Sequence, residues 1–402
     1  ADTVDGGGGA NTLFLTGSYA FTAPTTDAQL VNVLTISAAA AGAGVTASFA
    51  SQTESFSITG GSFADSLTGG SGNDTFYGFV GADTLIGGGG LDTLVMNSTS
   101  STLNVATNTQ LQNIGAITAA TATSGVTIRL VNQGENFSIT GSSFADSLAG
   151  GYSVNTFNGF VGADTLDGSN GSSSLVLNAT STDLNIASDV QLLGVSTVTA
   201  ATATSGVTIT LSNQTEDLNI TGSGFADSLT GGSGYDTFYG FVGADTIVGG
   251  SGSDKLVLSA TSSDLNTAGD AQLVSLESVT ASGSSGIVIT LANQTESLSI
   301  TGSSYSDSLT GGSGSDVFYG FTAGDTVDGG AGTDSIYLTN FNLNASSDAQ
   351  LVNVEKIYAT SGSSTVNLTG QTEGFSIYGS TYADSLKGGA GGDSFYDFTG
   401  AD

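Results

Sequence analysis

The stretch that decides the fold reads Asp65-Ser-Leu-Thr-Gly-Gly-Ser-Gly-Asn-Asp74-Thr-Phe-Tyr-Gly-Phe-Val-Gly-Ala-Asp83-Thr-Leu-Ile-Gly-Gly-Gly-Gly-Leu-Asp92-Thr-Leu94. Aspartates recur in it every nine residues, and an apolar side chain follows each aspartate two residues later. Two of the intervening turns read Gly-Gly-x-Gly-x-Asp. The pattern predicts short strands joined by tight turns, because strand side chains alternate in direction and glycine accepts positive φ.

The same nonapeptide, Gly-Gly-x-Gly-x-Asp-x-apolar-x, is typical of parallel β-helices that bind calcium. On these residues the chain resembles the RTX, or haemolysin-type calcium-binding, family. The resemblance implies a calcium-loaded parallel β-roll and export from the cell. Two nine-residue half-coils make one coil, so Asp74 and Asp92 fall on the same edge and could hold one ion between them. Calcium takes six to eight oxygen ligands in flexible geometry, which carboxylates and turn carbonyls supply.

Composition narrows the functional classes. The 402 residues include 61 Gly, 4 Lys+Arg and 36 Asp+Glu, with a net charge of −32 and no Cys or His. Nucleic acid and anionic membranes are poor partners for such a chain, because neutralising phosphates requires Lys and Arg. The lack of Cys excludes disulfides and thiolate metal sites. No apolar run is long enough for membrane insertion, and no catalytic constellation is present, so we expect no enzyme activity.

The nonapeptide stretch belongs to a repeat of about 81 residues. Equivalent aspartates fall at Asp2, Asp83, Asp164, Asp245, Asp325 and Asp402, at intervals of 81, 81, 81, 80 and 77 residues. We therefore expect an all-β fold, a parallel β-roll or β-solenoid built from five tandem repeats with two short strands per coil. The units span approximately 2–82, 83–163, 164–244, 245–324 and 325–402. Residues 1–402 are expected to be one continuous solenoid and an excerpt of a longer repeat array.

The other half of each repeat carries an Asp-Ala-Gln-Leu-Val-type element, at 27–31, 270–274 and 348–352, followed by alternating β-branched residues such as 207–211. Period-two alternation of this kind predicts strands. The count gives about eight strands, or four coils, per repeat. Helix is expected only as short turns around 104–112 and 185–193.

Successive nonapeptide turns alternate between two types of sequence, which predicts two different edges of the solenoid. On the glycine edge the Gly-Gly-x-Gly-x-Asp motif is intact in the turns that end at Asp74 and Asp92, Asp236 and Asp254, Asp316 and Asp334, and at Asp393. Counted by these turn pairs, they belong to the first, third, fourth and last repeats. The candidate calcium ligands are the aspartates and turn glycines of this edge: Asp74, Asp92, Asp236, Asp254, Asp316, Asp334, Asp393, Gly70, Gly72, Gly88, Gly90, Gly232, Gly234, Gly250, Gly252, Gly312, Gly314, Gly330 and Gly332. The alternative is that the aspartates only cap backbone amides as Asx-turns.

On the aromatic edge, a ring replaces one glycine of each turn, as in Phe63 and Phe79. The equivalent positions are Phe144, Phe160, Phe225, Phe241, Tyr305, Phe321, Tyr382 and Phe398. We hypothesise that stacked rings close this edge, in place of or beside a weaker ion. Two alternatives remain open. The rings could cover core exposed at wide turns, or they could contact a neighbouring molecule.

The second repeat has lost both aspartates of the glycine edge. Its turns read Gly150-Gly-Tyr-Ser-Val-Asn155 and Gly168-Ser-Asn-Gly-Ser-Ser173. This repeat is expected to bind no ion, or a weak one. Residues 6–11, Gly-Gly-Gly-Gly-Ala-Asn, are intermediate.

The function predicted from these observations is that of an extracellular structural protein, a calcium-stabilised β-roll in a surface layer, filament or matrix. The resemblance to the family leaves two alternatives: the spacer region of a giant adhesin, or the calcium-dependent secretion module of an exported enzyme. Calcium is the expected cofactor. Self-association into a polymer or lattice is the expected partnership, with polysaccharide as a further candidate. The expected location is the bacterial cell surface or the medium.

Overall fold

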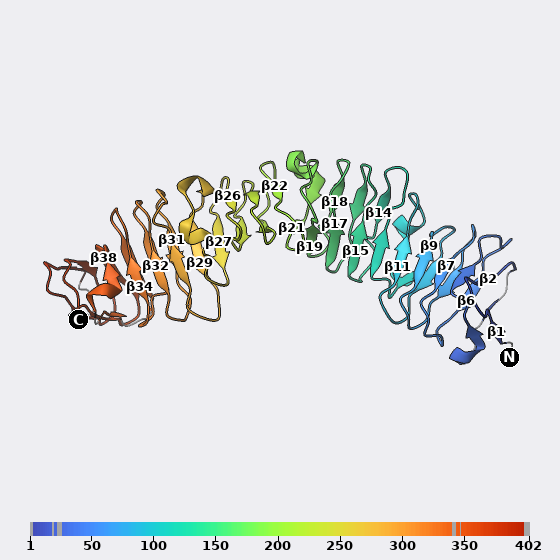
Figure 1. The fold of residues 1–402 in the computed structure, drawn as a ribbon, viewed down its shortest axis with the longest axis horizontal. Helices are drawn as coiled ribbons and strands as arrows, with labels where there is room; N and C mark the ends of the chain where they lie inside the picture. The colour runs from blue at the N-terminus through green and yellow to red at the C-terminus, as the bar shows by residue number, and fades with distance from the viewer. Residues whose placement is uncertain (1–2, 18–19, 22–25, 340–342, 346, 398–402) are drawn as a thin grey trace. The chain divides into compact units, whose positions relative to one another are not determined.

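The computed structural model describes residues 3–17, 20–21, 26–339, 343–345 and 347–397, which form a parallel β-solenoid (Figure 1). Short strands alternate between two faces, and glycine-rich or aromatic turns join them along the two edges. The chain divides into two compact bodies: an N-terminal body up to residue 177 with 181–198, and a C-terminal body of 178–180 with 199 onward. The prediction of one continuous solenoid stays a prediction.

The first face carries one strand from each coil, and its paired strands run parallel. In the N-terminal body its strands are β2 (Thr12–Phe14), β5 (Thr35–Ser37), β7 (Ser57–Thr59), β9 (Thr75–Tyr77), β11 (Thr93–Val95), β13 (Ala116–Thr118), β15 (Phe137–Thr140), β17 (Asn155–Asn158), β19 (Ser173–Val176) and β21 (Val195–Thr199). In the C-terminal body they are β23 (Asn219–Thr221), β25 (Thr237–Tyr239), β27 (Lys255–Leu258), β29 (Ser278–Ala281), β31 (Ser299–Thr301), β33 (Val317–Tyr319), β35 (Ser335–Thr339), β38 (Lys356–Ser361), β40 (Ser376–Tyr378) and β42 (Ser394–Tyr396).

The second face is divided into short parallel sheets. The N-terminal body has the pair β1 (Val4–Asp5) and β4 (Leu30–Val31), then β3 (Ala20–Phe21), β6 (Thr46–Ser48), β8 (Ser66–Thr68), β10 (Thr84–Ile86) and β12 (Leu111–Gln112), then β14 (Thr127–Arg129), β16 (Ser147–Ala149), β18 (Thr165–Asp167) and β20 (Leu192–Leu193). The C-terminal body has β22 (Thr208–Thr210), β24 (Ser228–Thr230), β26 (Thr246–Val248) and β28 (Leu273–Val274), then β30 (Val288–Thr290), β32 (Ser308–Thr310), β34 (Thr326–Asp328) and β37 (Leu351–Val352), then β36 (Leu343–Asn344), β39 (Thr365–Asn367) and β41 (Ser385–Lys387).

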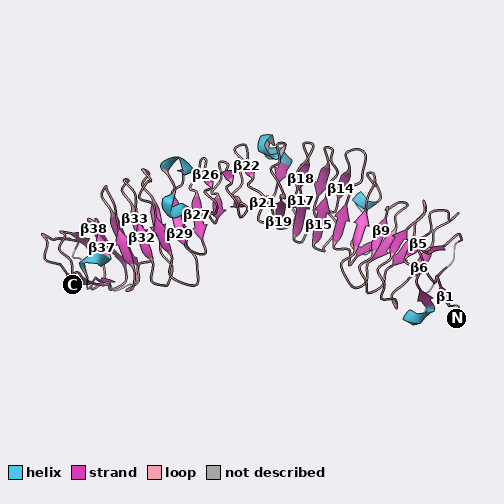
Figure 2. Ribbon diagram, viewed as in Figure 1, coloured by secondary structure: helices cyan, strands magenta, loops and turns pink. Residues whose placement is uncertain are grey.

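The second face is interrupted by longer loops that contain 3-10 turns (Figure 2). Such a loop, called the excursion below, lies for example at residues 96–110, 177–191 and 259–272. These turns are η1 (Asp27–Gln29), η2 (Leu103–Val105), η3 (Leu184–Ile186), η4 (Asp189–Gln191), η5 (Leu265–Thr267), η6 (Asp270–Gln272) and η7 (Asp348–Gln350). The turns predicted around 104–112 and 185–193 are thus confirmed. In the described residues, none of these segments is long and apolar enough to cross a membrane.

Side chains of the excursion replace the missing strand. The amide of Arg129 donates to Asn104 Oδ1 at 2.8 Å, and the amide of Thr127 donates to Thr99 Oγ1 at 2.8 Å. In the C-terminal body, Thr290 donates to Asn266 Oδ1 in the same way. These bonds satisfy the edge of β14 and of β30, which would otherwise present unpaired backbone groups. The sheet therefore ends without exposing a free strand edge.

The core lies between the two faces and consists of the middle residue of each strand. On the first face Ile58, Phe76 and Leu94 are in register and at most 1% exposed. On the second face Leu67 pairs with Leu85. Residues 83–163 and 245–324 each contain eight strands, which confirms four two-strand coils per repeat. A single coil buries too little apolar surface to fold alone, so stacking on neighbours supplies the stability.

The outward side of the first face carries a tyrosine column in the last repeat. Tyr337, Tyr358 and Tyr378 stack with ring centroids 4.5 Å apart, and Tyr396 continues the column at 4.8 Å. Tyr319 joins it at 5.3 Å with a larger tilt. In-register strands bring identical side chains to this spacing, and aromatic pairs of this kind contribute about 0.5–1.5 kcal/mol each. At the equivalent positions the first repeat has Thr59, Tyr77, Val95 and Thr118.

Candidate metal centres

The first aspartate of each glycine-edge pair has hydrogen-bond partners on both carboxylate oxygens. Asp74 Oδ1 accepts from the amide of Phe56 in the preceding coil, and Oδ2 accepts from the amide of Gly70, both at 2.7 Å. Asp236, Asp316 and Asp393 repeat this arrangement. These aspartates do cap backbone amides, as the Asx-turn alternative anticipates. They also tie each turn to the preceding coil.

The second aspartate of each pair is different. Asp92 Oδ1 accepts from the amide of Asp74 at 2.7 Å, whereas Asp92 Oδ2 is buried and has no hydrogen-bond partner. Asp254 and Asp334 have the same unpartnered Oδ2 atom, and each of the three residues is at most 1% exposed. A buried carboxylate oxygen without a donor is costly in a folded protein. Each of these atoms therefore calls for a cation or a proton.

The difference between the two turns lies in the backbone. Gly88 and Gly90 have φ of +105° and +94°, and their counterparts in the third and fourth repeats are also positive. Gly70 and Gly72, in the first turn, do not adopt the left-handed region. There glycine is required by space, because a Cβ atom on Gly72 would collide with the backbone of Glu54. One sequence motif thus folds into two turn conformations, and only one of them leaves Oδ2 without a donor.

Oxygen atoms converge around the unpartnered Asp92 Oδ2. A Cβ atom on Gly87 would collide both with this oxygen and with the carbonyl oxygen of Asn113 in the following turn. Gly249 and Gly329 leave the same space next to Asp254 and Asp334, facing the carbonyls of Ser275 and Asn353. Glycine is therefore the residue that permits a carboxylate and a carbonyl to face a common point.

Burial and the charge of neighbouring acids disfavour the ionised form of these carboxylates. Burial raises the pKa of Asp92 to about 6, and the charge of Asp74 adds to the increase. Burial likewise raises the pKa of Asp254 and Asp334 to about 6, with further contributions from Asp236 and Glu277, and from Asp316 and Glu355, respectively. A bound cation would remove this penalty, because it favours the charged form of each carboxylate.

The donor set fits calcium. Within the described residues, no group of three or more Asp, Glu, His or Cys side chains surrounds a single point. An ion on the glycine edge must therefore take one or two carboxylates and complete its shell with turn carbonyls. An all-oxygen set with flexible spacing suits calcium, and the absence of nitrogen and sulfur donors disfavours zinc.

The second repeat lacks this donor set. The side-chain amide of Asn155 donates from Nδ2 to the carbonyl of Gly151 at 3.1 Å and to that of Ser153 at 2.9 Å. Nδ2 also lies against Gly150, as Asp74 Oδ2 lies against Gly69 in the first repeat. An N–H donor thus replaces a carboxylate oxygen and points at the carbonyls. Ser173 follows in place of the second aspartate.

The aromatic edge satisfies its carboxylates internally. Asp83 Oδ1 accepts from the amide of Asp65 and Oδ2 from the amide of Val80, both at 2.8 Å. The corresponding second aspartates of the later repeats, Asp164, Asp245 and Asp325, have the same two kinds of donor. Burial raises the pKa of Asp83 to about 6, and the charge of Asp65 adds to the increase. Unlike Asp92, this carboxylate has donors on both oxygens.

The prediction that rings stack along this edge is wrong for the described residues. Phe79, Phe160, Phe241 and Phe321 are buried in the core, whereas Phe63, Phe144, Phe225, Tyr305 and Tyr382 are 44–54% exposed. Phe398 lies outside the described residues. The physical reason is the register of adjacent coils, in which Leu67 pairs with Leu85. This register places Phe63 next to Gly81 and Phe79 next to Gly61. Consecutive turns therefore never align two rings. The buried set covers core, and the exposed set remains available for contacts.

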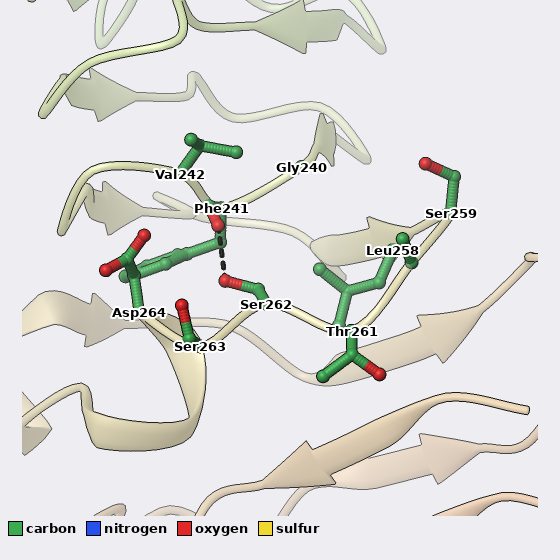
Figure 3. A pocket seen from close by; sticks show the side chains of 10 residues that line it. Gly240, Phe241, Val242, Leu258, Ser259, Thr261, Ser262, Ser263 and Asp264 are labelled. Atoms are coloured by element: carbon green, nitrogen blue, oxygen red, sulfur yellow. Dashed lines mark hydrogen bonds between the residues drawn. The ribbon is translucent and has the colours of Figure 1, made fainter.

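A shallow pocket of about 220 Å³ opens on the aromatic edge of the third repeat (Figure 3). Ser262 Oγ donates to the carbonyl of Phe241 and accepts from the amide of Leu265, which starts η5. Asp264 Oδ2 accepts from the amide of Gly243 at 2.8 Å. Ser100 and Ser181 make the equivalent bonds in earlier repeats. The lining contains hydroxyls and one carboxylate, and the bonds of Ser262 hold the chain at the start of η5.

A family model described as the RTX calcium-binding nonapeptide repeat (4 copies) matches residues 1–17, 59–94, 140–175, 221–256, 301–336 and 376–402. These segments of the chain carry RTX calcium-binding nonapeptide repeats. RTX repeats bind calcium and are typical of secreted proteins, and their β-roll is typically structural rather than catalytic. The matched segments include 140–175, where the aspartates of the glycine edge are missing. No curated protein matches the chain in a sequence search.

Sequence analysis did not identify two glutamates on the glycine edge. Glu277 Oε2 accepts from the amide of Asp254 at 2.6 Å, and Glu355 Oε2 accepts from the amide of Asp334 at 2.7 Å. They lie 23 and 21 residues after their aspartates. The nine-residue spacing hides them, because the excursion lengthens that coil. In the sequence, each glutamate stands directly before a strand, at the position where a nonapeptide turn has Asp.

Proposed function

We propose that this chain is an extracellular structural protein whose β-roll is held together by calcium along the glycine edge. In the first repeat the ion is held by the turns ending at Asp74 and Asp92, in the third by those of Asp236 and Asp254, and in the fourth by those of Asp316 and Asp334. The carbonyls of the turn glycines complete each shell. Asp393 supplies the first half of such a site in the last repeat.

The observation that supports this proposal is the unpartnered Oδ2 atom of Asp92, Asp254 and Asp334. All three atoms lie on the glycine edge of the intact repeats. The corresponding aspartates of the aromatic edge have donors on both oxygens. Among the described second aspartates, an oxygen is therefore left without a donor on the glycine edge and not on the aromatic edge.

Calcium would offset two costs that this sequence carries. Ordering a turn residue costs about 1–2 kcal/mol, and glycine loses more freedom than other residues. The chain also carries a net charge of −32, so that folding brings like charges together. When free calcium is at one hundred times the Kd of a site, that site adds about 2.7 kcal/mol to the free energy of unfolding. Extracellular calcium modules work at 10⁻⁴–10⁻³ M, which favours folding outside the cell.

The test is removal of calcium from the purified chain. A chelator should lower the midpoint of thermal unfolding and the β-sheet signal in far-UV circular dichroism. Added calcium should restore both, whereas magnesium at the same concentration should not, because it requires rigid octahedral geometry. A spectrum and a melting curve that do not change on chelation would overturn the proposal.

The structural role, in a surface layer, filament or matrix, is tested separately by negative-stain imaging with and without calcium. Stacked repeats that lack a catalytic constellation support this role. Ordered sheets or fibres that form only with calcium are the expected result. Isolated rods at all calcium concentrations would contradict self-association and favour the spacer function of an adhesin instead.

A further inference from the structure

Each pair of nonapeptide turns is followed on the glycine edge by a turn that does not match the nonapeptide. In the third repeat this turn is Ser275-Leu276-Glu277, and in the fourth it is Asn353-Val354-Glu355. Strand register places Ser278 opposite Lys255, so Glu277 lies opposite Asp254. Register between Ser335 and Lys356 likewise places Glu355 opposite Asp334. Each glutamate therefore stands where the next aspartate of an uninterrupted run would be.

The glutamate also makes the bond that such an aspartate would make. Glu277 Oε2 accepts from the amide of Asp254, as Asp92 Oδ1 accepts from the amide of Asp74. Glutamate is one methylene longer than aspartate, and this length lets it reach across to the preceding turn. The carboxylate ladder of the glycine edge therefore continues by one step beyond the last nonapeptide.

We propose that Glu277 and Glu355 each complete a further calcium site, formed with the carboxylates of Asp254 and Asp334 and the carbonyls of Ser275 and Asn353. The proposal rests on calcium binding at the glycine edge, as proposed above. It adds one ion to the third repeat and one to the fourth, beyond the ion between the two nonapeptide turns.

The buried oxygen atoms argue for an ion at this place. Asp254 is 1% exposed, and its Oδ2 has no hydrogen-bond partner. The space at Gly249 is where this oxygen meets the carbonyl oxygen of Ser275. Asp334 is fully buried and repeats the arrangement with Gly329 and Asn353. One carboxylate and one carbonyl from two adjacent turns thus border each space, and the glutamate of the second turn accepts from the amide of the same aspartate.

The charge balance points in the same direction. Glu277 Oε2 lies 2.6 Å from the amide nitrogen of Asp254, and Glu355 Oε2 lies 2.7 Å from that of Asp334, so each pair of acids is held in adjacent turns. Lys255 lies next to the third-repeat site in sequence, but it starts β27 on the first face. Lys356 follows the fourth-repeat site in the same way and starts β38. Each site thus joins a buried aspartate to a glutamate of the adjacent turn, and a divalent cation would neutralise both charges.

The other repeats provide an internal comparison. In the first repeat, Thr93 pairs with Ala116, so Gly115 lies opposite Asp92. In the second repeat the equivalent residue, 81 positions later, is Ser196. Neither supplies a carboxylate. A Cβ atom on Gly115 would meet nothing within 4 Å. A glutamate could therefore be introduced at that position beside the unpartnered Asp92 Oδ2.

The test counts bound calcium per chain by equilibrium dialysis and elemental analysis of the full chain. The double variant E277Q/E355Q should bind roughly two calcium ions fewer than the wild type, because an amide is a weaker ligand than a carboxylate. Gln retains an oxygen that accepts the amide of Asp254 or Asp334, so the fold should persist. The matched control is E135Q, in the repeat without aspartates, where Glu135 Oε1 accepts from the amide of Asn113.

A second variant keeps the proposal falsifiable if E277Q/E355Q does not fold. G115E should gain about one ion, with the acid completing a site beside Asp92. Wild-type stoichiometry in both E277Q/E355Q and G115E would overturn the further sites while leaving those of the nonapeptide pairs intact. A wild-type chain that binds no calcium would instead contradict the proposed function itself.

Discussion

Asp92 and Asp83 occupy equivalent places on opposite edges and differ in one donor. Oδ2 of Asp83 accepts from the amide of Val80, whereas Oδ2 of Asp92 faces Gly87 and the carbonyl of Asn113. The carboxylate of Asp83 belongs to a closed hydrogen-bond network, and that of Asp92 does not. A substitution should therefore have different consequences at the two positions.

Asp92→Asn is expected to lower the melting temperature by several degrees in saturating calcium, because one ligand is lost. In chelator the same variant should melt no lower than the wild type, because the amide removes a buried charge without a donor. Thermal melts in both buffers measure this. The matched control, Asp83→Asn, should shift the melting temperature equally in both. A calcium-independent effect of Asp92→Asn would contradict its role as a ligand.

The free energy of unfolding should depend on pH differently with and without calcium. Burial raises the pKa of Asp83, Asp164 and Asp245 to about 6 in the folded chain, against about 4 for an unfolded one. The folded state then binds protons more tightly, so in chelator the free energy of unfolding should increase as the pH falls from 7 to 5. With calcium, protons compete for Asp92, so the stabilisation by calcium should shrink over the same range. Melts at both pH values test whether the gap narrows.

At the scale of the element, the two aromatic positions of each turn pair have opposite surroundings. Phe79 is fully buried and belongs to the core, whereas Phe63 is 44% exposed. The coil period places each ring over a glycine, so the two rings act independently. The exposed set recurs once per repeat on one edge and is the surface most suited to contact with a neighbouring molecule.

Phe79→Ala should lower the free energy of unfolding by about 3–5 kcal/mol, because it leaves a cavity in the core. Phe63→Ala should cost under about 1 kcal/mol, as is usual for an exposed side chain. Denaturant unfolding in calcium-saturated buffer gives both values. Equal losses at the two positions would mean that the edge depends on both rings together, as stacking requires.

At the scale of the whole molecule, stability in a solenoid is a sum over neighbouring coils, and the second repeat is the one expected to lack an ion. Asn155 Nδ2 points at the carbonyls of Gly151 and Ser153, and Ser173 replaces the second aspartate. The turns also have Ser153 and Ser169 where the first repeat has Gly72 and Gly88. Restoring the two aspartates tests whether the carboxylates alone recover calcium binding on this backbone.

The variant Asn155→Asp with Ser173→Asp should gain about one calcium ion and unfold at higher temperature in calcium only, by up to about 2.7 kcal/mol at one hundred times Kd. Calcium counting and melts in calcium and in chelator measure the two effects. The control is Ser153→Asp, which adds a charge to the same turn without restoring the motif. If the double variant and the control have equal calcium counts, the motif is not sufficient for binding.

The sequence was enough to predict the solenoid, its two edges and its coil count, because aspartate and apolar residues mark every half-coil. It could not distinguish Gly70 from Gly88, which share a motif but differ in φ. That difference in φ depends on the residues of the adjacent coil against which each turn packs, and it is visible only in the folded structure. Glu277 was missed for a related reason, since an excursion of variable length separates it from Asp254. The contrast between Phe63 and Phe79 likewise depends on stacking phase.

The tyrosine column of the last repeat has a spectroscopic consequence. The chain has no Trp, so phenol rings dominate its near-ultraviolet absorption. Rings held 4.5 Å apart at interplanar angles of 13° and 21° form a coupled array of chromophores. The near-ultraviolet dichroism of this protein should therefore report mainly on the order of its last eighty residues, like a label fixed at one place.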